Sequence, residues 1–160
     1  LEGDAETFGD LDLLIGQGWM DAARQALRTA GAQELAPRPP SDVYLTEQFC
    51  ECRLDQVDFD LLCGFAVRRE GVAYRYPFEA RRIVKTVAVL GENVPLSPPA
   101  DWYVLYRLMP DHGDKADVIA RRLAARPREE WAPWLEEWLS GPLPDELRWR
   151  VRALLESAGQ

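Results

Sequence analysis

The chain has 160 residues, 47% of them apolar, and its 27 acidic and 19 basic residues give a net charge of −8. This size and composition suit one domain, or two small domains that share a core, and exclude a disordered chain. The negative charge opposes non-specific binding to nucleic acid or to anionic membranes, although a local basic site for a phosphorylated ligand remains compatible with it.

The sequence has the character of a cytoplasmic protein. It contains no apolar run long enough to span a membrane and no recognisable signal peptide. Three cysteines (Cys50, Cys52 and Cys63) are an odd number and fit reduced thiols better than a disulfide scaffold, and a single histidine argues against a zinc site. The chain lacks an initiator Met and runs almost directly into a predicted strand, so we expect some N-terminal sequence to precede it.

The first part of the chain alternates strand and turn patterns, with one helix. Residues 10–15 predict a strand, and residues 19–30 predict a helix that ends at Gly31. The segment APRPPSD is expected to be a loop, because its three prolines cannot donate backbone hydrogen bonds. Strand-like runs follow in residues 42–54 and 56–67, with a hairpin-like return at 68–78 around Glu70-Gly71. Residues 81–97 predict a strand, a turn at Gly91-Glu92-Asn93 and a short second strand. This order of elements predicts a mixed β-sheet with a helix packed on it.

After residue 96 the pattern becomes helical. Ser97 is placed to cap a helix that carries Trp102, Leu105, Tyr106 and Met109 on one face, and three more helices are predicted at 114–125, 129–139 and 145–157. Tryptophans at this helical spacing are expected to pack in the core. The fold class predicted is therefore α+β, with a sheet-containing core in residues 1–96 and a small C-terminal helical bundle in residues 97–160.

Two pairs of aspartates raise the question of function. Asp10 and Asp12 alternate with leucines, and Asp58 and Asp60 occur in the same way in QVDFDLLCGF. In a strand, residues i and i+2 lie on the same face about 6–7 Å apart. If the two strands are neighbours, three or four carboxylates converge, and such a cluster suits oxygen-ligated Mg²⁺. The alternative is that these aspartates form the solvated face of a half-exposed sheet, although Asp is depleted in strands.

The DLDL motif, followed by a helix, a proline-rich loop and a strand containing FDLL, resembles the nucleotidyltransferase superfamily of the DNA polymerase β type. The closest similarity is to minimal bacterial nucleotidyltransferase-like proteins, which include antibiotic-modifying and toxin–antitoxin members. In that family two carboxylates lie on one strand and a third on a neighbouring strand. The family's Gly-Gly or Gly-Ser motif, expected some ten residues earlier, has no counterpart in LEGDAETFG. The core would thus lack its first strand–helix segment, which either precedes Leu1 or has been lost.

The resemblance implies a mechanism and a set of site residues. Asp10, Asp12 and Asp60 would bind Mg²⁺, and Asp60 or Asp58 would act as the general base for an acceptor hydroxyl that attacks the α-phosphate of a nucleoside triphosphate. Basic residues of the segment EARRIVKT are candidates for contact with the triphosphate, namely Arg81, Arg82 and Lys85. The acceptor would be a small molecule or a protein.

Two alternatives to this enzyme remain open at the level of sequence. The first is a catalytically inactive nucleotidyltransferase-like protein that binds a partner, as an antitoxin does. The second is an unrelated α+β domain whose aspartates face solvent. The nucleotide, the acceptor and the oligomeric state are not specified by the sequence.

Overall fold

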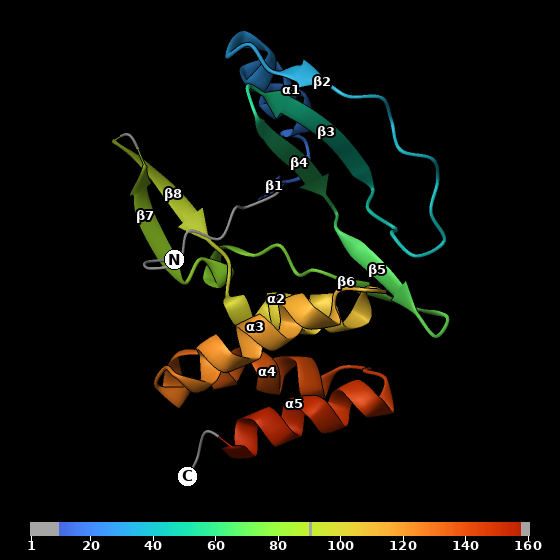
Figure 1. Cartoon of the computed structure of the whole chain (residues 1–160), viewed down its shortest axis with the longest axis vertical. Helices are drawn as coiled ribbons and strands as arrows, with labels where there is room; N and C mark the ends of the chain where they lie inside the picture. Colours follow the sequence, from blue (N-terminus) through green and yellow to red (C-terminus); the bar gives the residue numbers. More distant parts are fainter. Residues whose placement is uncertain (1–9, 90, 158–160) are drawn as a thin grey trace. The chain divides into compact units, whose positions relative to one another are not determined.

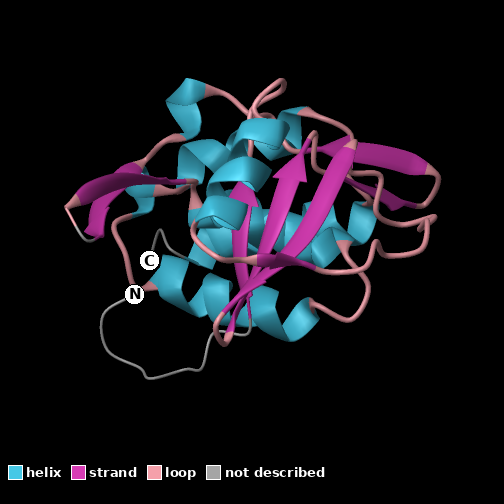
Figure 2. Ribbon diagram, turned by 90° about the horizontal axis from the view of Figure 1, so that it is seen from above, coloured by secondary structure: helices cyan, strands magenta, loops and turns pink. Residues whose placement is uncertain are grey.

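The computed structural model describes residues 10–89 and 91–157, and it is an α+β protein with a mixed sheet (Figures 1 and 2). The chain forms two compact units, Leu1–Ala66 and Val67–Gln160. The division between these units falls after Ala66, inside the segment that the sequence pattern groups as the 1–96 core. Each unit is described by itself below.

The first unit is built on a four-stranded sheet with the order β1-β4-β3-β2. Its strands are β1 (Asp10–Leu14), β2 (Gln33–Glu34), β3 (Gln48–Leu54) and β4 (Val57–Cys63). β1 runs parallel to β4, whereas β3 is antiparallel to both β4 and β2. The prediction of a mixed sheet is therefore confirmed.

A two-residue turn sets the register of β3 against β4. Leu54 pairs with Val57, so Asp55 and Gln56 form the turn, and Asp55 has a positive φ of 56°. Short hairpin turns of this kind need left-handed backbone, which Asp adopts more readily than most residues. The same register places Glu51 opposite Asp60, and Arg53 opposite Asp58.

One face of the sheet is covered by α1 (Met20–Thr29). Alternate residues of the strands point to this face, as the period of two requires. Together with Met20 of α1 and Ala32, which follows α1, they form an apolar core. The buried strand residues of this core are Cys50, Cys52, Leu61 and Cys63. The three cysteines carry free thiols and are buried. The aspartates alternate with these core residues and so belong to the opposite face.

Two strand predictions in this unit need correction. The segment 56–67 does not form one continuous strand, because Gly64 has a φ of +63° and separates β4 from β5 (Ala66–Arg69). The predicted strand 42–54 begins only at Gln48, and the preceding residues form an irregular segment. The helix predicted at 19–30 is confirmed, and Gly31 follows it with a φ of +97°.

The second unit begins with two hairpins. β5 pairs with β6 (Val72–Arg75) around Glu70 and Gly71, both of which have positive φ, so the predicted hairpin is confirmed. A short 3₁₀ turn, η1 (Ala80–Arg82), leads into the second hairpin, which consists of β7 (Lys85–Val89) and β8 (Glu92–Leu96).

Four helices complete the second unit, in agreement with the helices predicted after residue 96. They are α2 (Pro99–Leu108), α3 (Gly113–Ala124), α4 (Ala132–Ser140), which follows the 3₁₀ turn η2 (Arg128–Glu130), and α5 (Asp145–Ser157). α2 contacts each of the other three (Figure 1). Among the described residues, no helix has both the length and the apolar character needed to cross a membrane.

The start of α2 differs from the prediction. Its N-cap is Pro98, and Ser97 makes no cap hydrogen bond; the Ser97 hydroxyl instead accepts a hydrogen bond from Trp102 Nε1 at 2.7 Å. Asp101, in the first turn of α2, is completely buried, while Trp102 is half-buried. The buried face of α2 is therefore rotated relative to the predicted one.

Candidate functional site

Three carboxylates from two neighbouring strands lie close together in the first unit. One oxygen each from Asp10, Asp12 and Asp60 can be chosen so that all three oxygens lie within 4.8 Å of one another. We refer to these residues as the acidic triad. Asp10 and Asp12 are exposed, whereas Asp60 is only 7% exposed. The predicted convergence of the two aspartate motifs is confirmed.

The sheet register explains why these side chains meet. β1 and β4 are parallel, with Asp10 beside Asp58 and Asp12 beside Asp60. Residues that are paired across neighbouring strands point to the same face. Each strand therefore presents its aspartates to the face opposite α1, where they form a patch of negative charge.

Asp58 does not join the triad, although the sequence left it as an alternative to Asp60. Its two carboxylate oxygens accept hydrogen bonds from Arg53 Nε at 2.5 Å and Arg53 Nη2 at 2.8 Å. This bidentate pair lowers the pKa of Asp58. A carboxylate held in this way is a weak base and has few lone pairs left for a metal ion.

Asp60 has the opposite electrostatic environment. Burial raises its pKa to about 6, and the neighbouring negative charges of Asp12, Glu51 and Asp10 add to this effect, while Arg38 opposes it. Among the described residues, Oδ1 of Asp60 has no hydrogen-bond partner although it is buried. A buried oxygen without a partner is costly, so this atom is ready to accept a proton or a cation.

Two further residues of the site were not singled out by the sequence. Arg38, in the proline-rich loop, has Nη2 3.5 Å from Asp60 Oδ2, and its Nε donates a hydrogen bond to Glu51 Oε2 at 2.8 Å. Glu51 could have been found from the turn at Asp55 and Gln56, because a two-residue turn places it opposite Asp60. No sequence signal locates Arg38, since its position depends on the path of an irregular loop.

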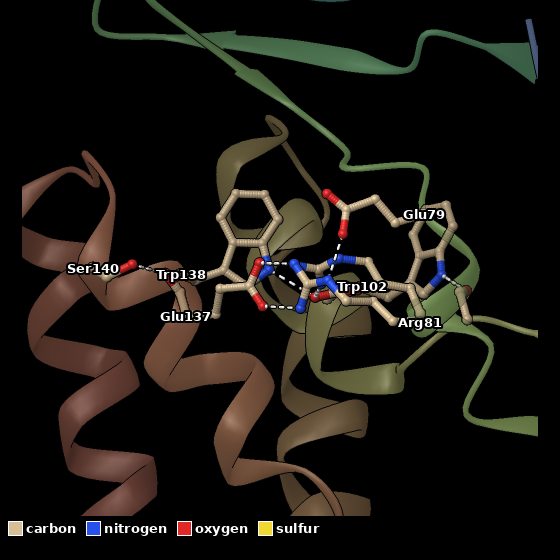
Figure 3. A network of polar contacts seen from close by, with 9 residues as sticks. Glu79, Arg81, Trp102, Glu137, Trp138 and Ser140 are labelled. Atoms are coloured by element: carbon tan, nitrogen blue, oxygen red, sulfur yellow. Dashed lines mark hydrogen bonds and ion pairs between the residues drawn. The ribbon is translucent and has the colours of Figure 1, made fainter.

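The predicted triphosphate-contacting residues Arg81, Arg82 and Lys85 belong to the second unit. Arg81 forms ion pairs with Glu79 and with Glu137, and both partners are drawn in Figure 3. Lys85 is exposed on β7.

Arg82 is only 3% exposed and is held by two carboxylates, those of Asp101 and Glu137. Asp101 also accepts a hydrogen bond from Trp138 Nε1 at 2.8 Å. These contacts give Arg82 a clear structural role within the second unit. Whether any of the three basic residues contacts a nucleotide stays a prediction.

The composition of the triad suits a hard divalent cation. Its donors are carboxylate oxygens alone, which Mg²⁺ prefers, and with no thiolate or imidazole among them the site does not favour zinc. The buried, unpartnered oxygen of Asp60 provides a ligand that a cation would satisfy. The residues present therefore fit the metal that the sequence resemblance implies.

The segment LEGDAETFG, in which the glycine motif was not found, lies outside the described residues. Comparison of the chain with protein-family models, with curated proteins and with solved structures gave no significant match.

Proposed function

We propose that this protein is a Mg²⁺-dependent nucleotidyltransferase that transfers a nucleotidyl group from a nucleoside triphosphate to a hydroxyl of a small molecule or a protein. The observation that carries the proposal is the acidic triad, in which two adjacent strands bring three carboxylates within 4.8 Å. The resemblance of the DLDL and FDLL segments, which contain the same three aspartates, to the nucleotidyltransferase superfamily also supports it.

Each member of the triad has a role in this proposal. Asp10 and Asp12, exposed on β1, hold Mg²⁺ together with Asp60. When bound, Mg²⁺ supplies charge neutralisation and polarisation at the phosphate oxygens. Asp60 also accepts the proton of the acceptor hydroxyl on a carboxylate oxygen. The acceptor oxygen bonds to the α-phosphorus, the bond from that phosphorus to the bridging oxygen breaks, and pyrophosphate leaves with the electron pair.

The environment of Asp60 suits a general base better than that of Asp58. Oδ1 of Asp60 is buried in the triad and, among the described residues, has no hydrogen-bond partner, so it can accept a proton. Asp58 is already held by Arg53, and its pKa is lowered. We therefore assign the role of base to Asp60.

The test compares two aspartates on the same face of the sheet. Binding of each of the four nucleoside triphosphates is measured by calorimetry with Mg²⁺ and with EDTA, for the wild type and for Asp12→Asn and Asp58→Asn. We expect Mg²⁺-dependent binding of at least one nucleotide, weakened about tenfold or more by Asp12→Asn and little changed by Asp58→Asn. Asp12→Asn should leave the metal-free fold intact or slightly more stable, because it relieves like-charge repulsion.

Catalysis is then tested with the nucleotide that binds. α-Labelled nucleotide is incubated with the protein and a cell extract that contains both small-molecule and protein acceptors, and transfer of label is measured together with release of pyrophosphate. Absence of any Mg²⁺-dependent nucleotide binding would contradict the proposal, as would equal effects of Asp12→Asn and Asp58→Asn.

A second candidate function is that of a nucleotidyltransferase-like binding protein without catalytic activity. One contact favours it, because Asp60 already has a positively charged neighbour in Arg38, which could take the place of a metal ion. In that case the wild type would bind its partner without Mg²⁺, and no label would be transferred.

A further inference from the structure

Arg38 brings a positive charge to the acidic triad. It lies in the loop between β2 and β3, and its guanidinium reaches Glu51 on β3 and Asp60 on β4. The hydrogen bond to Glu51 raises the pKa of Arg38 most, and the negative charges of Asp60 and Asp10 add to this effect. Arg38 therefore stands beside the triad in the same unit, unlike the basic residues that the sequence suggested.

The loop and the sheet together hold the Arg38 side chain in place. Three prolines flank Arg38 in APRPPSD, and each restricts its own backbone φ and the conformation of the residue before it. The guanidinium lies over the ring of Phe49, with its central carbon 4.9 Å from the ring centroid. Phe49 and Glu51 are two positions apart on β3, so their side chains lie on the same face of the sheet and both contact Arg38 from there.

These contacts do not use all the hydrogen-bond donors of the Arg38 guanidinium. The separation of 3.5 Å between Arg38 and Asp60 is too long for a good hydrogen bond, whereas Arg53 and Asp58 form a bidentate pair at 2.5 and 2.8 Å. The Arg38 side chain is 56% exposed, and among the described residues only its Nε forms a hydrogen bond of ordinary length. Because a guanidinium has five N–H donors, most of its capacity remains for a ligand.

The charge balance of the proposed reaction calls for such a residue. Three carboxylates and a triphosphate carry roughly seven negative charges, and even two divalent ions supply only about four positive ones. A fixed cation beside the carboxylates reduces this excess. Arginine is suited to the purpose because its planar fork matches the oxygens of a phosphate group.

We propose that Arg38 binds a phosphate group of the nucleoside triphosphate at the acidic triad, with Glu51 and Phe49 holding its guanidinium in position. This inference rests on the proposed function. It assigns to the proline-rich loop a phosphate contact beside the triad's carboxylates.

Arg53 offers a matched control. It lies on the same face of the sheet as the triad and also pairs with a carboxylate, but that carboxylate is outside the triad. Arg38→Gln and Arg53→Gln remove the same charge and leave similar side chains. Both variants and the wild type are titrated with the Mg²⁺ complexes of nucleoside triphosphate and of inorganic tripolyphosphate, and separately with Mg²⁺ alone, after their unfolding transitions have been compared.

We expect Arg38→Gln to weaken binding of both Mg²⁺–phosphate ligands about tenfold or more, while its affinity for Mg²⁺ alone stays the same or increases because a competing cation is gone. Arg53→Gln should change each affinity by less than about threefold. Arg38→Lys should restore only part of the binding, since an ammonium group lacks the fork geometry.

Three results would overturn the inference while the proposed function stands. The first is a wild type that binds Mg²⁺–nucleotide and an Arg38→Gln variant that binds it equally well. The second is an equal loss in Arg53→Gln, which would show a general effect of charge. The third is a parallel loss of affinity for Mg²⁺ alone, which would show that Arg38 only shapes the triad. A wild type that binds no Mg²⁺–nucleotide would overturn both proposals.

Discussion

At the scale of single residues, Asp60 combines burial in the sheet with a raised pKa. It is a buried carboxylate with three acidic neighbours (Asp10, Asp12 and Glu51) and one basic neighbour (Arg38), and its pKa is raised to about 6. An acid whose pKa is higher in the folded state than in the unfolded state binds protons more tightly when folded. Its contribution to stability is therefore greatest at low pH, and it is lost as the pH rises from about 4 to about 6.

Asp60→Asn should remove this pH dependence in the metal-free protein. Above pH 7 we expect the variant to be more stable than the wild type by about 1–2 kcal/mol, less than the full shift implies because the amide has its own cost of burial. Near pH 4 the two proteins should differ much less. Urea unfolding in EDTA from pH 4 to 8 measures the difference, and a stability gap that is constant over this range would contradict the assignment.

Residues show most clearly what the sequence could predict. The alternation with apolar residues was enough to place Asp10 with Asp12, and Asp58 with Asp60, on one face of their own strands, because the period of a strand is local information. That the two strands are neighbours is shown only by the pairing of β1 with β4. The choice between Asp58 and Asp60 needed the register of β3, since Arg53 is opposite Asp58 and removes it from the cluster.

At the scale of elements, the periodic segments were predicted, and the buried face of α2 was missed because it depends on a contact outside the helix. The helix at 19–30 and the hairpin at Glu70–Gly71 follow from spacing and turn residues alone. In α2, Asp101 is buried because Arg82, which belongs to a different element, forms an ion pair with it at 2.5 Å. No pattern within a helix reveals a partner that lies elsewhere in the chain.

Gly64 separates two strands that the sequence pattern joined. Its φ of +63° is unfavourable for other residues, and a Cβ built on it would lie 2.6 Å from Cδ of Glu47. We expect Gly64→Ala to destabilise the protein by about 1–2 kcal/mol. Since the clash is with a flexible side chain, adding Glu47→Ala should recover only the steric part.

Chemical denaturation of the single and double variants measures both parts. Gly71→Ala is the control, because Gly71 also has a positive φ but its Cβ would have nothing within 4 Å. If Gly64→Ala proved as stable as the wild type, the left-handed backbone at this position would be of no energetic importance.

At the scale of the whole molecule, ion pairs join two of the four helices of the second unit to a segment that precedes them in the chain. Arg82, in η1, is bound to Asp101 of α2 and Glu137 of α4, so the residues before α2 supply the charge that the buried Asp101 requires. Removing one partner of a buried ion pair costs about 3–5 kcal/mol, because the other charge remains uncompensated. The helices thus depend on a residue that precedes them.

We expect a fragment of residues 67–160 to unfold cooperatively and a fragment of residues 97–160 not to do so. The shorter fragment lacks Arg82 and leaves Asp101 without its cationic partner. Thermal unfolding followed by circular dichroism distinguishes the two.

Substitutions in the fragment 67–160 distinguish the loss of Arg82 from the effect of a shorter chain. Arg82→Met should lower its melting temperature strongly, whereas Arg81→Met, which removes an exposed arginine paired with the same Glu137, should have a small effect. A sharp transition of residues 97–160 would show that the helices fold without Arg82.

The parallel pairing of β1 with β4 has a consequence for the order in which the chain assembles. β3 and β4 are joined by two residues and can pair rapidly, but β1 must reach β4 across α1, β2 and β3. Pairing between distant segments carries a larger entropic cost of loop closure and tends to come late in folding. We therefore expect Asp60 to be in place before Asp10 and Asp12 arrive, so that these two residues dock against the repulsion of Asp60 and Glu51. An ion bound by all three carboxylates would exist only after this final step, so it would act on the lifetime of the finished sheet rather than on the speed of its formation.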